Sequence, residues 1–163
     1  MSLHYVIDGY NLINHPAFLR SVRRNKDQRA ALASLIVTAR LCGSPKNKIT
    51  IVFDGYPPAL ETNKKFAGID SIFSRDDSAD ERIKKIVERS PGPKNIIVVS
   101  DDKEIRFIVK SIGAHVLGIE EFMLPLEDTA DKAGDIRALN KDLNYSQINS
   151  INQELKKKWL KAL

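Results

Sequence analysis

The fold is decided at residues 96–102, which read IIVVSDD. The four apolar residues at 96–99 predict a β-strand that is buried on both faces, because no polar residue alternates with them. The strand ends at Ser100, and two acids, Asp101 and Asp102, follow directly. This pattern, a buried strand followed directly by acids at its carboxyl end, recurs elsewhere in the chain.

Two other apolar runs end in the same way. Residues 5–7 lead into Asp8, and residues 49–53 lead into Asp54, each acid followed by a glycine. Shorter strands are predicted at residues 69–73 and 115–117. Helical patterns separate the strands: residues 27–41, a segment opened by the capping box of Ser78 and Glu81, and an apolar face at Ile105, Ile108, Val109 and Ile112. Buried strands alternating with helices predict an α/β fold with a parallel sheet covered on both faces.

The length, composition and net charge limit the class of protein. A length of 163 residues with 42% hydrophobic residues fits one domain with a sizeable core. No apolar run reaches the roughly 18 residues of a membrane helix, and the N-terminus lacks a signal-peptide pattern. The single cysteine, Cys42, suits a reducing compartment, so we expect a cytoplasmic protein that does not bind a membrane. The net charge of +5 is compatible with nucleic acid binding but is weak evidence alone.

The end of the chain differs in character from the rest. We expect residues 1–126 to form the domain and residues 127–163 to form a polar connector followed by a basic amphipathic helix. That helix carries one apolar stripe at Ile148, Ile151, Leu155 and Trp159. The stripe either packs on the core or docks RNA or a protein partner.

The aspartates that follow the strands are the first candidates for chemistry. Asp8, Asp54 and Asp101 each follow a strand, and the carboxyl ends of parallel strands meet at one edge of a sheet, where ligands bind. Asp80 begins a helix that should start near the same edge. Carboxylates held together repel one another unless a cation joins them, and oxygen donors without a His or Cys cluster favour Mg²⁺ or Mn²⁺ over Zn²⁺. His4, His15 and His115 lack ligand spacing and are expected to be structural or exposed.

Each acid also has a purely structural interpretation. Asp101 could be a helix N-cap completed by Glu104, Asp54 could begin a turn, and Asp80 and Glu81 favour a helix N-terminus electrostatically. Asp8 is harder to explain in this way, because the residues after it are not typical of the start of a helix. The joint placement of the acids is what favours a functional site.

Six motifs in order resemble those of one nuclease family. They are VIDGYN at residues 6–11, IVFD at 51–54, SADE at 78–81, VVSDD at 98–102, GAHV at 113–116 and EEF at 120–122. Together they resemble the YacP-like group of NYN domains, a branch of the PIN-like nucleases, over residues 4–124. Ser78 is a mild departure, because family members commonly have threonine there.

The resemblance implies a PIN-like three-layer fold, with five parallel strands in the order 3-2-1-4-5 and helices on both faces. It also implies a metal-dependent endoribonuclease acting on ribosome-associated or structured RNA. Asp8, Asp80 and Asp101 are then the expected catalytic residues and metal ligands. The supporting candidates are Asn11, Asp54, Glu81 and Asp102. Asp76 and Asp77 leave open which carboxylate near residue 80 reaches the metal. Cleavage by a metal-activated water predicts 5′-phosphate and 3′-hydroxyl ends.

An acidic site needs basic residues nearby if it is to bind a polyanion. The predicted RNA-binding residues lie in the segment after the first strand and around the third, at Arg20, Arg23, Arg24, Lys26, Lys64, Lys65 and Arg75. Tyr10, Tyr56 or Phe18 could stack on unpaired bases.

Three other functions compete with this one. A haloacid-type phosphatase needs a second aspartate where Tyr10 stands, and a response-regulator receiver needs paired acids where Asp8 stands alone. The serious alternative is a PIN-like module that binds RNA or the ribosome without cutting it. The sequence leaves the RNA target, the number of metals and the oligomeric state open.

Overall fold

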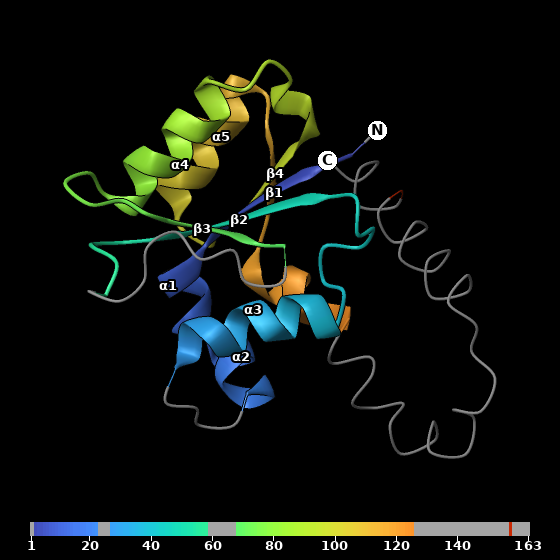
Figure 1. The fold of residues 1–163 in the computed structure, drawn as a ribbon. Helices are drawn as coiled ribbons and strands as arrows, with labels where there is room; N and C mark the ends of the chain where they lie inside the picture. The colour runs from blue at the N-terminus through green and yellow to red at the C-terminus, as the bar shows by residue number, and fades with distance from the viewer. Residues whose placement is uncertain (1, 23–26, 59–67, 126–156, 158–163) are drawn as a thin grey trace.

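A parallel sheet of five strands forms the centre of the molecule (Figure 1). The structure is a computed structural model that describes residues 2–22, 27–58, 68–125 and 157. The strands are β1 (His4–Asp8), β2 (Lys48–Phe53), β3 (Asp70–Phe73), β4 (Ile96–Val99) and β5 (His115–Leu117). Their order is β3-β2-β1-β4-β5, so the α/β fold and the predicted strand order are confirmed. Ile7 of β1 lies opposite Ile51 of β2 and Val99 of β4, which aligns the ends of the three central strands.

Two helices, α4 (Ala79–Glu88) and α5 (Lys103–Ile112), cover one face of the sheet (Figure 1). They bury residues at helical spacing, among them Ile83 and Val87 of α4 and Ile105 and Val109 of α5. These side chains pack on the strand residues that point to the same side, Val6, Val52 and Val98 among them. The capping box predicted at Ser78 begins α4, with the Ser78 hydroxyl accepting a hydrogen bond from the Glu81 backbone N–H.

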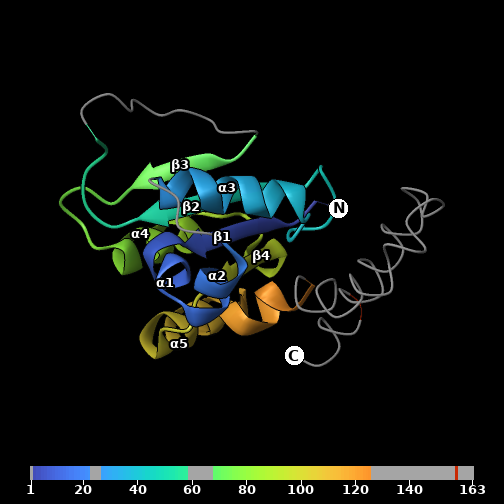
Figure 2. The same ribbon diagram turned by 90° about the horizontal axis from the view of Figure 1, so that it is seen from below.

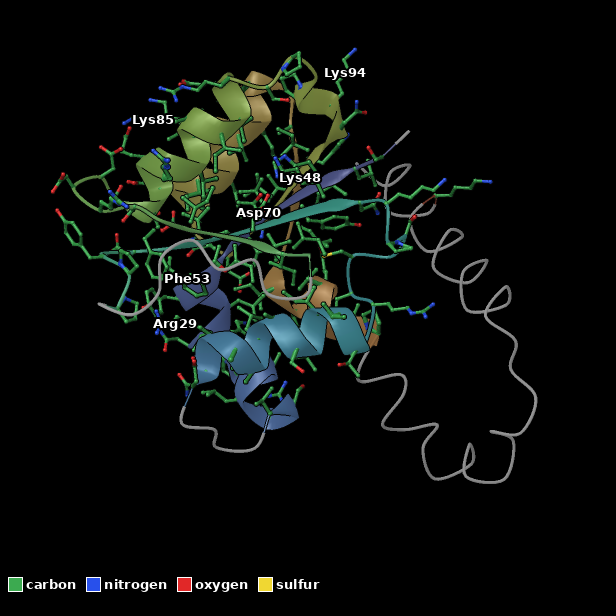
Figure 3. The ribbon with its side chains drawn as sticks, in the orientation of Figure 1. Arg29, Lys48, Phe53, Asp70, Lys85 and Lys94 are labelled. Atoms are coloured by element: carbon green, nitrogen blue, oxygen red, sulfur yellow. The ribbon has the colours of Figure 1, made fainter. Side chains whose placement is uncertain are left out.

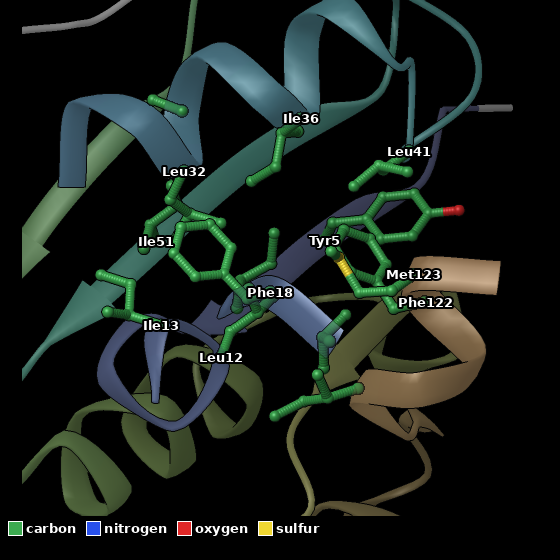
Figure 4. Close-up of a cluster of buried hydrophobic side chains, with 14 of the residues drawn as sticks. Tyr5, Leu12, Ile13, Phe18, Leu32, Ile36, Leu41, Ile51, Phe122 and Met123 are labelled. Atoms are coloured by element: carbon green, nitrogen blue, oxygen red, sulfur yellow. The ribbon is translucent and has the colours of Figure 1, made fainter. Parts of the chain in front are cut away.

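The other face carries the larger core. Three helices cover it, α1 (Gly9–Ile13), α2 (Pro16–Ser21) and α3 (Gln28–Thr38), together with the helical residues 119–125 (Figures 1 and 2). Phe18, Leu32, Ile36 and Phe122 are fully buried in this cluster (Figure 4). Both faces are covered, which agrees with central strands that are apolar over most of their length.

Two helix boundaries differ from the prediction. The helix expected over residues 27–41 spans Gln28–Thr38, with Asp27 as its N-cap. Arg40 follows the helix with a left-handed backbone (φ 51°), which interrupts it before Leu41. The residues after Asp8 are not typical of a helix start, yet they form the short helix α1 from Gly9. Such a short helix is held by packing, since Leu12 and Ile13 are buried, rather than by propensity.

The polar connector and the final helix predicted over residues 127–163 lie outside the described residues, apart from Lys157 in a helical conformation. Within the described part of the chain, none of the helices has the length and apolar character required to cross a bilayer.

Candidate nuclease site

The carboxyl ends of the strands open into a cavity of about 550 Å³. Four of the predicted acids line it: Asp8 at the end of β1, Asp54 after β2, Asp80 in the first turn of α4, and Asp101 after β4. Asn11, Tyr10 and His15 contribute from α1 and the turn that follows it. The fold therefore brings together most of the predicted site residues, while Glu81 and Asp102 do not line this cavity.

Asp8 is the buried member of the group, with 7% of its surface exposed. Its carboxylate accepts a hydrogen bond of 3.4 Å from the Ser100 hydroxyl. Burial, with a smaller contribution from the charge of Asp80, raises the pKa of the Asp8 carboxyl to about 6, although hydrogen bonds from Asn11 and Ser100 lower it. Asp8 thus carries a negative charge that the fold tolerates poorly without a cation.

The position after Asp8 has room only for a glycine, Gly9. A Cβ at this position would lie 2.4 Å from Cε1 of Phe53 and 3.0 Å from Cγ2 of Ile51. Phe53 cannot move away easily, because its ring packs between Tyr10 and Phe73 with centroid distances of 5.3 and 5.5 Å. Only glycine lets the chain turn from β1 into α1 this close to β2.

Gly9→Ala is therefore expected to lower the free energy of unfolding by about 1–3 kcal/mol, the cost of overpacking a core. A loss of stability would be informative, because replacing glycine by alanine in a helix normally stabilises a protein. Gly92→Ala is the matched control, since its Cβ would meet only the amide of Asn95, at 3.3 Å. Urea unfolding measures the free energy of unfolding of both variants and of the parent. If Gly9→Ala is as stable as Gly92→Ala, then β1 and β2 can separate at Gly9 without cost.

Asp101 is oriented by two partners. Its Oδ1 accepts a hydrogen bond of 2.9 Å from the backbone N–H of Ile119, and its Oδ2 lies 3.2 Å from Nε2 of His15. Nδ1 of His15 accepts a hydrogen bond from the Ala17 N–H at the start of α2, so the ring proton is on Nε2, directed at Asp101. Asn11 adds a third link, because its Oδ1 accepts from the Asp101 backbone N–H at 3.2 Å.

His15 was not predicted as part of the site. Its spacing along the chain gave no ligand pattern, and its contact with Asp101 arises only when the α1–α2 connection folds over the end of β4. A histidine at a helix N-cap could have been noticed from Pro16, since proline is common at the first position of a helix. Nothing local indicated Asp101 as its partner.

The cap of α5 is Asp102 rather than Asp101. Oδ1 of Asp102 accepts hydrogen bonds from the backbone N–H groups of Glu104, at 2.8 Å, and Ile105, at 3.3 Å. The structural interpretation of Asp101 as an N-cap is therefore wrong, and Asp101 is left with its carboxylate in the cavity. The supporting role of Asp102 in the site stays a prediction, and its place as the cap of α5 confines that role to holding the backbone next to Asp101, which asparagine would also do.

Asp54 and Asp80 differ in their surroundings. Asp54 Oδ1 accepts from the Ser74 hydroxyl at 3.0 Å and from the Ala79 N–H at 3.2 Å, so it joins β2 to the start of α4. Burial, and then the charges of Asp102 and Glu104, raise the pKa of Asp80. Asp80 also lines a smaller cavity of about 190 Å³ between α4 and α5, which is where Glu81 lies. Glu104, also in that cavity, was not predicted.

The oxygen donors suit a hard divalent cation, but they do not form a finished cage. Among residues 2–22, 27–58 and 68–125, no three His, Cys, Asp or Glu side chains are arranged to hold a metal ion. Mg²⁺ commonly binds through one or two carboxylates and completes its shell with water and substrate phosphate. The donor set fits that mode of binding, and it does not fit a closed structural site.

The predicted RNA-binding residues are only partly described. Arg20 lies exposed on α2, and Arg75 lies exposed after β3. Arg23, Arg24, Lys26, Lys64 and Lys65 lie outside the described residues. Of the predicted stacking aromatics, Tyr10 lines the cavity and is 38% exposed and Tyr56 is 63% exposed, whereas Phe18 is 1% exposed in the core and cannot stack on a base.

Five parallel strands in this order, with carboxylates gathered at their carboxyl edge, agree with the fold that the resemblance to PIN-like nucleases implied. The YacP-like NYN domain family matches residues 5–163, and the chain belongs to that family. The match runs to the end of the chain, so it extends well past residue 124, where the resemblance of the motifs was expected to stop.

Two solved structures have a similar fold. The crystal structure of Rae1 (YacP) from Bacillus subtilis is 20% identical, with a TM-score of 0.59, and the alignment covers 99% of this chain and 94% of that one. A tryptophan-to-leucine mutant of the same protein is 21% identical, with a TM-score of 0.59 and coverage of 98% and 92%. Comparison with curated proteins gives no match.

Proposed function

We propose that the protein is a metal-dependent endoribonuclease that hydrolyses RNA phosphodiester bonds to 5′-phosphate and 3′-hydroxyl ends. The observation that carries the proposal is the cavity at the carboxyl edge, where buried Asp8 shares one space with Asp80 and Asp101. Membership of a nuclease-like family supports it. We further propose ribosome-associated or structured RNA as the substrate, and a cytoplasmic location in keeping with the single cysteine.

Asp8, Asp80 and Asp101 would hold Mg²⁺ or Mn²⁺, with Asn11 and Asp54 as supporting oxygen donors. The metal, when bound, supplies positive charge to the phosphate and lowers the pKa of a water molecule. In the hydrolysis the water oxygen forms a bond to phosphorus, the bond from phosphorus to the 3′-oxygen breaks, and that oxygen leaves with a proton.

The remaining residues act by position. His15 and the Ile119 N–H fix the direction of the Asp101 carboxylate, and Asn11 holds the Asp101 backbone beside α1. Asp54 anchors the start of α4 and thereby the place of Asp80. Tyr10, half-exposed at the rim, offers an aromatic face to an unpaired base.

The test is RNA cleavage with Mg²⁺, with Mn²⁺ and with excess chelator, followed by analysis of the new ends. We expect cleavage with metal only, and 5′ ends that a ligase accepts without prior phosphorylation. Undiminished cleavage in chelator, or 2′,3′-cyclic phosphate ends, would exclude this mechanism.

The second candidate function is a PIN-like module that binds RNA without cutting it. One observation favours it, namely that no three-residue metal cluster exists among the described residues. RNA binding without cleavage in either metal, on RNAs that include structured and ribosomal species, is the outcome this alternative predicts.

A further inference from the structure

A second cavity, of about 620 Å³, lies on the α4 side of β2 and β3. It shares no lining residue with the cavity that holds Asp8. It exists because β3 is an edge strand whose four residues all stay partly exposed. Lys48 and Asp70 lie on this side of the sheet, whereas Phe53 and Arg29 lie on the side of α3 (Figure 3). We refer to this cavity as the β2–β3 groove.

The lining of the β2–β3 groove carries a net positive charge. Three cations, Lys48, Arg75 and Arg82, face one acid, Asp70, and burial together with the charge of Lys48 lowers the pKa of His4, which keeps that side chain neutral. Within the described part of the chain, none of the three cations forms an ion pair. Basic side chains in a concave surface that form no ion pair with another described residue are suited to an anionic ligand.

The groove also has apolar surface. Ile72 and Ile86 line it half-buried, and Pro57 borders it. Cations and apolar atoms side by side suit a nucleotide, which presents phosphate and a base or ribose together, better than they suit a bare inorganic anion. The volume lies within the range of about 300–1,000 Å³ found for small-molecule sites, which admits one or two nucleotides but not a double helix.

Arg75 lines the groove and is connected to the acidic cavity by a chain of hydrogen bonds. Its backbone is left-handed (φ 59°), a conformation that costs any residue other than glycine, asparagine or aspartate. Its N–H donates to the Gly55 carbonyl at 2.8 Å, and the Gly55 N–H donates to the Ser74 hydroxyl at 3.0 Å. Ser74 in turn donates to Asp54, which lines the acidic cavity. A strained residue held by such a network is a feature of functional sites.

We propose that the β2–β3 groove binds single-stranded RNA next to the phosphate that is cut, with Arg75, Arg82 and Lys48 contacting backbone phosphates. The proposal rests on the proposed function, because it places the groove on the path of the same substrate. The acids of the catalytic cavity repel a polyanion, and the groove supplies three cations that form no ion pair with another described residue. The strand would pass from the groove across Arg75 to the site at Asp8.

The decisive variant is Arg75→Gly, which removes the guanidinium and relieves the backbone strain. Arg40→Gly is a matched control, because Arg40 is the other non-glycine residue with a positive φ among the described residues, at 51°, and lines neither cavity. Both variants lose one charge and gain a favourable backbone. Binding is measured by fluorescence anisotropy with a labelled ten-nucleotide RNA in chelator, so that no cleavage occurs, over a range of salt concentrations.

We expect Arg75→Gly to weaken binding about tenfold, the effect of losing one charged hydrogen bond. The slope of log K against log salt should fall by about 0.7, the value for one phosphate contact on a single strand. Its melting temperature should equal or exceed that of the parent. Arg40→Gly should leave the affinity and the slope unchanged.

A second variant, Arg82→Gln, keeps a good helix former in α4 and should lower the slope by the same amount. Equal slopes for the parent, Arg75→Gly and Arg82→Gln would overturn the proposal, as would a duplex competitor that binds as well as the single strand. These outcomes are independent of catalysis. If the parent cleaves RNA but the variants keep its salt slope, only the proposal that the β2–β3 groove binds RNA is contradicted. If the slopes fall but no protein cleaves RNA, only the proposed nuclease activity is contradicted.

Discussion

Replacing Asp8 by asparagine is expected to abolish RNA cleavage and, at the same time, to make the metal-free protein more stable at neutral pH. The carboxylate is 7% exposed, and its charge is disfavoured by burial and by neighbouring acids. Asparagine has nearly the same shape and can still accept the hydrogen bond from the backbone of Asn11. The substitution therefore removes the buried charge without opening a cavity.

The raised pKa of Asp8 determines how the free energy of unfolding changes with pH. The pKa of Asp8 is raised in the folded protein from 3.8 to about 6, so its ionisation is harder than in the unfolded chain. Below pH 3.8 the carboxyl is neutral in both states and costs nothing. As the pH rises through this interval the folded state loses stability, and above about pH 6 the loss is complete, at roughly 3 kcal/mol for two pKa units.

Chemical unfolding in chelator at pH 4 and pH 7.5 measures this difference. Asp8→Asn should match the parent at pH 4 and exceed it at pH 7.5. Asp77→Asn is an informative control, because the hydrogen bond from Lys85 lowers the pKa of Asp77, so its charge stabilises the fold above the unfolded pKa. That variant should gain nothing at pH 7.5. If Asp8→Asn is no more stable than the parent at pH 7.5, the charge of Asp8 does not destabilise the folded protein.

Added Mn²⁺ provides an independent readout on the same proteins. A ligand that binds only the folded state raises stability by about 2.7 kcal/mol at one hundred times its dissociation constant. The parent should show such a gain, and Asp8→Asn should show a smaller one. An undiminished gain in the variant would place the cation elsewhere.

The strands and the gathering of the acids could be predicted from the sequence because both depend on short-range patterns. Each central strand is an apolar run that ends in a polar residue, and parallel strands place their carboxyl ends together whatever their order. The order itself did not follow from these patterns. It came from the resemblance to NYN domains, because apolar runs of similar length do not specify which strands are neighbours.

The parts that were missed depend on contacts between distant residues or on the local backbone. Asp101 and Asp102 are adjacent acids before a helix, and only the extended backbone of Asp102 decides which one caps it. His15 meets Asp101 across 86 positions of sequence, and the helix at Gly9 forms because its apolar side is buried. The β2–β3 groove arises because α4 leaves the edge strand partly uncovered, which no residue pattern reveals.

Asp101→Asn and Asp102→Asn form a matched pair that should separate a site residue from a helix cap. Asparagine caps a helix about as well as aspartate, so Asp102→Asn keeps the hydrogen bonds to the start of α5. It should lose only the interaction of the charge with the helix dipole, about 0.3–1 kcal/mol. Asp102 does not line the cavity, and cleavage should therefore stay close to that of the parent.

Asp101→Asn should behave differently although the residue is a neighbour of the same type. Its Oδ1 can still accept from the Ile119 N–H, but its amide nitrogen would face the Nε2–H of His15, donor against donor. It also removes a charge from the cavity. Since partners of a metal ligand already contribute about 10–100-fold, loss of the ligand itself should lower cleavage at least about a hundredfold.

Both variants are compared with the parent by the rate of RNA cleavage and by the melting temperature with Mn²⁺ and with chelator. We expect the parent and Asp102→Asn to share one metal-induced shift, and Asp101→Asn to show a smaller one. Its melting temperature in chelator should stay near that of the parent, which separates loss of the metal from loss of the fold. Intact cleavage and a full Mn²⁺ shift in Asp101→Asn would remove this residue from the site, whereas their loss in Asp102→Asn would make the cap of α5 a metal ligand.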